Sequence, residues 1–288
     1  MSLFALSLIL FSACIHVVQH IAIKRARDRT AFVWWAWFWG CALFSPAPFF
    51  LWQPIPARAW VILLISAIFE LLYYLAITRA YQTGDLSVVY PLARGTAPVF
   101  ILLWSMLFLG EFPSAGGAGG VGLIMTGLCV INLPRTITWA AFRQQLWRQG
   151  SRFAVLAGFC ISCYTTIDKA GVRLVTPLLF TWLVMSITLL LLTMWVMVSM
   201  GWRGLGDEWR NSGASTILAG ATAMAAFAII LYVMQTGVRA SYVGATREIS
   251  VVFGAVVGTV FLKEQGTRLR IAGAALIAAG VAAIAALG

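Results

Sequence analysis

Charged residues are scarce in this chain of 288 residues. Asp, Glu, Lys and Arg together make up 10% of the sequence, whereas hydrophobic residues make up 61%. A soluble domain of this length needs far more charge to cover its surface, so the composition excludes an ordinary globular protein. The mean hydropathy of +0.92 points to an integral membrane protein instead.

Motifs for catalysis and cofactor binding are also missing. The sequence contains neither Glu-x-x-His nor Gly-x-Ser-x-Gly, and the glycine-rich run at 116–120 lacks the Lys-Ser/Thr of a phosphate loop. Cys160-x-x-Cys163 has no partner pair, and all five cysteines fall in apolar runs, where they pack as small apolar side chains. We therefore expect no enzymatic activity, no metal and no cofactor.

Ten apolar runs approach the roughly 20 residues that cross a bilayer as a helix. Lipid cannot satisfy backbone polar groups, so each run must form its own hydrogen bonds as a helix. The first run lacks a basic leader and a cleavage site, which predicts a retained helix. We thus expect an all-α, multi-pass protein of the inner (plasma) membrane. The ten runs are 3–23, 32–52, 59–80, 86–109, 116–133, 153–174, 178–200, 214–236, 241–262 and 268–287.

The basic residues predict how the chain is oriented. The net charge of +11 is spread over short loops, which gives no indication of nucleic-acid binding. Of the twenty Lys and Arg residues, fourteen lie in odd-numbered loops and four in even-numbered loops. Because cytoplasmic loops are rich in Lys and Arg, the odd loops are expected in the cytoplasm and both termini outside it.

The chain repeats itself at an offset of 153 residues. The motif Gln-Thr-Gly at 82–84 recurs at 235–237, and Arg94 recurs as Arg247. Residues 1–133 and 153–288 then form two halves of five spans each, joined by an amphipathic linker at 134–152. An odd number of spans inserts the second half upside down, so we predict two inverted five-helix repeats. Further pairs in this register are Glu111 with Glu264, Gly120 with Gly273, Leu123 with Leu276, Ile124 with Ile277, Gly127 with Gly280 and Ile131 with Ile284.

The repeated segment resembles the EamA-type members of the drug/metabolite transporter superfamily. The resemblance lies in residues 76–99, in Phe-Leu-Gly-Glu at 108–111 and in Phe-Leu-Lys-Glu at 261–264, and it extends over essentially the whole chain. It implies a transporter that exports or exchanges amino acids, nucleotide sugars, drugs or other metabolites. It also implies cytoplasmic termini, which is the opposite of what the loop charges predict.

Four ionisable residues inside the predicted spans are the main candidates for a substrate site. Arg94 lies near mid-membrane and Arg247 is its repeat mate, so the two guanidinium groups either bind an anionic group or form structural salt bridges. Glu70 and Glu248 have the neutral repeat mates Ala223 and Gly95. These carboxylates are candidates for proton coupling, and the alternative is that they neutralise the arginines.

Other polar and aromatic side chains complete the prediction. His16 is either a titrating group of the site or a buried, hydrogen-bonded histidine. Asp168 and Lys169 either form a helix-end ion network or reach the site, while Glu111 and Glu264 read as architectural. Four tryptophans in the second span (Trp34, Trp35, Trp37 and Trp39) are expected at the interface or facing lipid. Tyrosines expected to line a wet pocket are Tyr73, Tyr74, Tyr90, Tyr164, Tyr232 and Tyr242.

These patterns predict a secondary-active carrier of a small polar metabolite with an anionic group, working by alternating access. The alternative substrates are a zwitterionic amino acid or a cationic drug. A membrane receptor or assembly subunit and an intramembrane enzyme are the rival classes. The partners expected are the substrate and the lipid bilayer, without nucleic acid. The small residues of the fifth and tenth spans predict tight helix packing within one chain, and a homodimer seam is the alternative.

Overall fold

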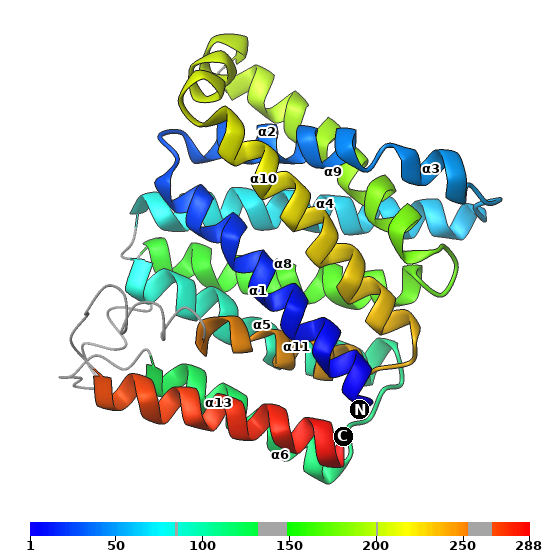
Figure 1. Ribbon diagram of the computed structural model, residues 1–288, viewed down its shortest axis with the longest axis vertical. Coiled ribbons are helices and arrows are strands. Elements are labelled where there is room, and N and C mark those ends of the chain that lie inside the picture. Colours follow the sequence, from blue (N-terminus) through cyan, green and yellow to red (C-terminus); the bar gives the residue numbers. More distant parts are fainter. Residues whose placement is uncertain (84–85, 132–148, 200, 253–266) are drawn as a thin grey trace. The chain divides into compact units, whose positions relative to one another are not determined.

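The computed structural model of the protein describes residues 1–83, 86–131, 149–199, 201–252 and 267–288. The regular elements of these residues are all helices, as backbone hydrogen bonding in lipid requires (Figure 1). They are α1 (Leu3–Arg25), α2 (Arg29–Leu43), α3 (Pro46–Leu51), α4 (Ala57–Thr83), α5 (Leu86–Phe108), α6 (Ala115–Ile131), α8 (Gln149–Gly171), α9 (Pro177–Ser199), α10 (Gly201–Gln235), α11 (Ala240–Arg247) and α13 (Thr267–Leu287).

The apolar character of the helices fits a multi-pass membrane protein. By length and composition, α4, α8, α9 and α10 are each able to cross a membrane, and α1, α5, α6 and α13 contain shorter apolar stretches. Large apolar side chains such as Phe49 and Val198 lie on the surface, 82% and 91% exposed. Exposed apolar side chains of this kind are suited to contact with lipid tails. The all-α membrane architecture is therefore supported, and the number of ten spans stays a prediction.

The second predicted span is two helices rather than one. Helix α2 ends at Leu43, and α3 starts at Pro46 after a short turn. Pro46 has no N–H with which to continue the hydrogen-bonding pattern of α2. A proline is well suited to the first position of a new helix, which is its place in α3. Hydropathy does not mark this break, because the residues around it are apolar apart from Ser45.

The eighth predicted span starts earlier than hydropathy suggested. Helix α10 begins at Gly201, which has a left-handed φ of 67°, and it includes the basic residues expected in a loop. Its first turns are held against the start of α2: Oε2 of Glu208 accepts the backbone N–H of Asp28 at 2.8 Å, and Trp35 donates to the carbonyl of Leu205 at 2.8 Å. These contacts stabilise a polar helical extension that a hydropathy pattern does not mark.

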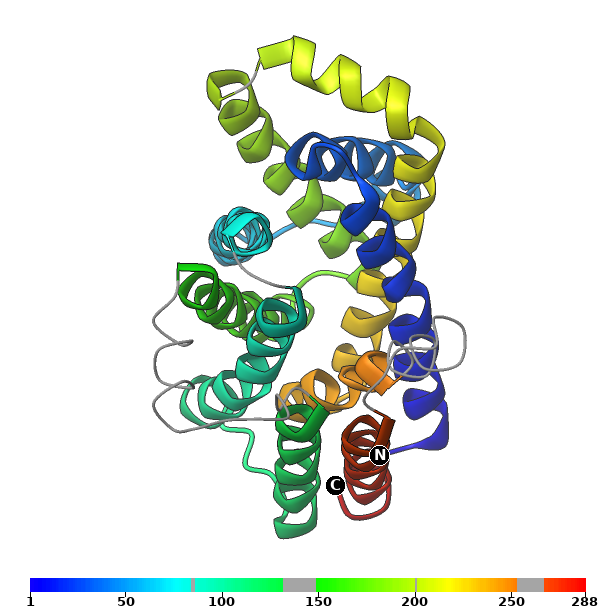
Figure 2. The same cartoon turned by 90° about the vertical axis from the view of Figure 1, so that its left-hand side faces the viewer.

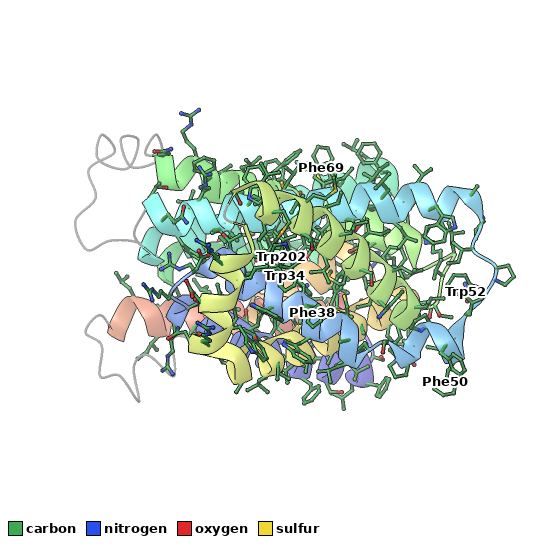
Figure 3. All side chains as sticks on the ribbon, turned by 90° about the horizontal axis from the view of Figure 1, so that it is seen from above. Trp34, Phe38, Phe50, Trp52, Phe69 and Trp202 are labelled. Atoms are coloured by element: carbon green, nitrogen blue, oxygen red, sulfur yellow. The ribbon has the colours of Figure 1, made fainter. Side chains whose placement is uncertain are left out.

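The tryptophans of α2 pack against this extension. Trp34 stacks on Phe38 with 5.5 Å between ring centroids and meets Trp202 edge-on at 6.4 Å, so the three rings lie together (Figure 3). Trp209 packs on both Trp35 and Trp39. Trp34 and its neighbour Trp37 are buried. The expectation that they face lipid was therefore wrong, because α10 supplies aromatic partners that only the fold brings near.

Residue contacts divide the chain into two compact units, each drawn from both sequence repeats. Unit 1 comprises residues 1–10, 72–166 and 238–288, and unit 2 comprises residues 11–71 and 167–237. The predicted linker at 134–152 lies outside the described residues except for 149–152, which form the first turn of α8. Helices of the two repeats thus interleave within each unit.

In unit 1, α6 and α13 lie side by side along their lengths (Figures 1 and 2). A Cβ atom added to Gly127 would lie 2.6 Å from the carbonyl oxygen of Gly273, and one added to Gly280 would lie 2.6 Å from that of Gly120. Seven residues forward on α6 correspond to seven residues backward on α13, so the helices cross antiparallel. Because these glycines are repeat mates, the crossing has the two-fold symmetry that an inverted repeat predicts.

Candidate functional site

Arg94 of α5 and Glu248, directly after α11, form a buried ion pair in unit 1. Nε of Arg94 lies 3.3 Å from Oε2 of Glu248, and the two side chains are only 9% and 4% exposed. Nη2 of Arg94 also donates a hydrogen bond to Oγ of Ser250 at 3.2 Å. Glu248 thus lies where it can neutralise Arg94, which is the alternative role that the sequence suggested for it. Ser250 was not predicted, because serine in an apolar span commonly bonds within its own helix.

The helix carrying Glu248 is interrupted at that residue. The N–H of Glu248 donates to the carbonyl of Ala245, and the N–H of Val251 donates to the carbonyl of Glu248. Both bonds span three residues instead of four, which makes a tight 3₁₀-type turn between α11 and the helical residues 249–252. In the first repeat, the equivalent Gly95 lies within the unbroken helix α5. The two halves therefore differ here both in sequence and in backbone.

The ion pair has no symmetric copy. The repeat mates of Glu248 and Ser250 are Gly95 and Ala97, which offer Arg247 neither a carboxylate nor a hydroxyl. Arg247 ends α11 and is less buried than Arg94. Two guanidinium groups and one carboxylate thus occupy the matched positions of the two repeats.

The predicted tyrosines divide into two groups. Tyr74 and Tyr164 are both buried, and they are joined through Tyr73, whose ring centroid lies 4.7 Å from that of Tyr74 and 6.1 Å from that of Tyr164. Tyr232 is instead 45% exposed. The side chain of Tyr90 lies outside the described residues.

The remaining predicted residues belong to unit 2. Glu70 of α4 is buried, at 4% exposure, and His16 of α1 is half-buried. Asp168 and Lys169, which were expected to form part of a helix-end ion network, each make a hydrogen bond to another helix. Asp168 accepts a hydrogen bond from Oγ of Ser66, and Nζ of Lys169 donates to the carbonyl of Met234 at 2.6 Å. Neighbouring positions on a helix point in different directions, which separates the two side chains.

A polar network ties the start of α11 to the loop before α6. The carboxylate of Glu111 accepts the N–H of Ala240 at 2.8 Å, in agreement with an architectural role; Glu264 lies outside the described residues. The hydroxyl of Tyr242 accepts hydrogen bonds from the N–H of Ser114 at 2.9 Å and from Nη1 of Arg239 at 3.1 Å. The repeat mates of Arg239 and Tyr242 are Leu86 and Val89, so this network also breaks the symmetry.

We expect Tyr242→Phe to lower the free energy of unfolding by about 1–3 kcal/mol, because the N–H of Ser114 loses its acceptor. Thermal unfolding of the purified protein in detergent measures the change. Tyr232→Phe removes an exposed hydroxyl and serves as the control, with no change expected. Equal stability of both variants would show that the network contributes nothing.

Comparison with known proteins gives a family and a fold. The EamA-like transporter family matches the chain over residues 1–133 and 148–286, which correspond to the two sequence repeats. Among solved structures, the chain is similar to the crystal structure of a protein with 16% sequence identity. The superposition covers 98% of this chain and 96% of the other chain, with a TM-score of 0.71. At this identity the likeness concerns the fold alone. No curated protein matches the chain.

Proposed function

The chain belongs to the EamA-like transporter family, and from this premise we propose that it carries a small polar metabolite with an anionic group by alternating access. The observation that supports the anionic group is the composition of the repeat-matched positions, which hold two arginines, Arg94 and Arg247, and one carboxylate, Glu248. A pair of guanidinium groups at matched positions of two inverted repeats favours a ligand that carries a negative charge.

Arg94 and Arg247 have different roles in this proposal. Glu248, at 3.3 Å, neutralises the charge of Arg94. Arg94 therefore contributes mainly a fixed hydrogen-bond donor to the ligand. Arg247 lies at the end of α11, next to the 3₁₀ turn, and it supplies the guanidinium group that binds the anion in fork geometry. The turn at Glu248 gives the helix a point at which small backbone rotations move Arg247.

The alternative substrates make use of Glu248. A zwitterion places its ammonium group on that carboxylate, and a cationic drug uses the carboxylate alone. Both require the ligand to displace Arg94 from the ion pair, which costs the interaction between two buried groups. An anionic ligand leaves the pair intact, and for this reason it is the substrate class we favour.

A ligand series on purified protein tests the proposal. Each candidate acid is compared with its amide and with the parent compound lacking the group, and the readout is the shift in melting temperature. We expect stabilisation by the acid alone, and a tenfold to hundredfold weaker affinity in Arg247→Gln, since a charged hydrogen bond contributes about 1.5–3 kcal/mol. Arg210→Gln, on the exposed start of α10, is the control. Stabilisation by amides as strong as by acids would contradict the anionic site.

The membrane context is also part of the proposal. We place the protein in the inner (plasma) membrane with both termini outside the cytoplasm, as the loop charges predict. A receptor or assembly subunit would show no substrate-dependent flux in vesicles, whereas a carrier does. A homodimer stays an open alternative, although the glycines of α6 and α13 that were candidates for its seam are used within the chain.

A further inference from the structure

Asp168 is a carboxyl group sealed inside unit 2. Its residue is 0% exposed on α8, a helix apolar enough to cross a membrane. Oδ1 accepts the hydroxyl of Ser66 from α4, and Oδ2 has no hydrogen-bond partner among the residues that the structure describes. An ionised carboxylate in such a place is very costly unless it is paired. The neutral acid, with its proton on Oδ2, removes that cost.

The charged groups around Asp168 are few. On α8 itself the next residue is Lys169, whose ammonium group donates to the carbonyl of Met234 at the end of α10. On α4, the second carboxyl group, Glu70, lies one turn beyond Ser66 and is also buried. Helix α9 and the part of α10 after Arg210 contain no acidic or basic side chain, and Tyr232 is the one phenol in these two segments. These surroundings favour an uncharged Asp168.

We propose that Asp168, held by Ser66, is a proton-binding site that couples transport to a proton gradient. The proton binds Oδ2 while Ser66 fixes Oδ1, so the site has one open position of the right size for a proton. A metal cation would need several more oxygen ligands than one carboxylate and one hydroxyl. The repeat mate of Asp168 is Ile15, so each chain has one such site.

This proposal differs from the coupling role that the sequence suggested for Glu70 and Glu248. Glu248 is engaged by Arg94 at 3.3 Å, and a carboxylate that shares an arginine has little reason to exchange a proton. Asp168 has a neutral hydroxyl donor in place of a cation. Proton binding stands on this geometry alone, whereas its use in coupling rests on the proposed transport function.

Infrared difference spectroscopy of the whole protein in lipid vesicles tests proton binding without any substrate. As the pH is changed, wild type is expected to show the carbonyl stretch of a buried carboxylic acid. Asp168→Asn should lose that band, and Asp207→Asn, which removes an exposed carboxyl group of α10, should keep it. Ser66→Ala should shift the frequency of the band, because Oδ1 loses its donor. The Ser66 variant keeps the test valid if Asp168→Asn does not fold.

Three results would overturn the proposal: an unchanged band in Asp168→Asn, no shift in Ser66→Ala, or a band that responds to sodium at constant pH. Coupling to transport is tested in a separate experiment. It measures uptake of the acid that stabilises the purified protein in the comparison of acids with their amides. A pH gradient should drive uptake by wild type and not by Asp168→Asn, which should retain exchange without a gradient. A titrating band without any flux by wild type would refute the transport function and leave the proton site standing. Gradient-driven uptake by Asp168→Asn would refute coupling alone.

Discussion

Arg94→Gln is expected to lower the free energy of unfolding by about 3–5 kcal/mol. Glu248 would remain buried while losing the cation that now lies 3.3 Å from it, and an uncompensated buried charge costs that much. Thermal unfolding in detergent and unfolding by denaturant in lipid both measure the effect. Arg210→Gln, which removes an exposed arginine from α10, is expected to change stability little and is the matched control.

The double variant Arg94→Gln/Glu248→Gln separates a lost attraction from a stranded charge. With both groups neutral, the two amides are able to hydrogen-bond to each other, and most of the lost stability should return. A double-mutant cycle then gives the coupling energy of the pair. If Arg94→Gln is as stable as wild type and the double variant gains nothing, the ion pair is not a structural element.

The role of Arg94 in stability affects what ligand binding by Arg94→Gln can show. A ligand that binds poorly to Arg94→Gln has lost either a direct contact or the position of α11, which Arg94 holds through Glu248 and Ser250. Arg247→Gln leaves the ion pair in place, so a loss of affinity in that variant reports on the anion site itself. The comparison of the two arginines is therefore more informative than either variant alone.

The architecture was accessible from sequence because its causes are local or symmetric. Hydropathy marks the apolar helices, and the repeat at 153 residues marks the two halves, which the family matches separately. The same register relates the glycine pairs at which α6 and α13 cross. Helix breaks were harder to predict, because the turn at Pro46 lies in mostly apolar sequence and the turn at Glu248 lies inside a single predicted span.

The candidate site was only partly accessible. Arg94 and Glu248 were found because charge is rare in apolar spans, but the sequence did not say which carboxylate pairs with which arginine. Ser66 and Ser250 carried no signal, since a serine in a membrane helix usually satisfies itself on its own backbone. Tyr232 was chosen for its chemistry alone, and its exposure depends on the face of α10 that packs inward.

The close crossing of α6 and α13 is the second place where single substitutions are expected to change stability strongly. We expect Gly127→Ala and its repeat mate Gly280→Ala to lower the free energy of unfolding by similar amounts, about 1–3 kcal/mol each. In each case the new Cβ would lie 2.6 Å from a carbonyl oxygen of the facing helix, and backbone cannot rotate aside as a side chain does. The helices must therefore separate and lose packing along the crossing.

Gly119→Ala and Gly122→Ala provide the controls on the same helix. A Cβ at either position meets nothing within 4 Å, so these variants should be neutral or gain up to about 1 kcal/mol from the higher helix propensity of alanine. Equal effects of alanine at Gly119 and Gly127 would mean that α6 and α13 do not cross closely.

The double variant Gly127→Ala/Gly280→Ala tests whether the crossing behaves as one two-fold symmetric interface. If the first alanine already moves the helices apart along their length, the second meets less resistance. The combined loss should then be smaller than the two single losses together. Strict additivity would mean that each alanine is accommodated by small shifts around its own position. A much larger effect at one position than at its repeat mate would show that the inverted symmetry does not extend to the energetics of packing.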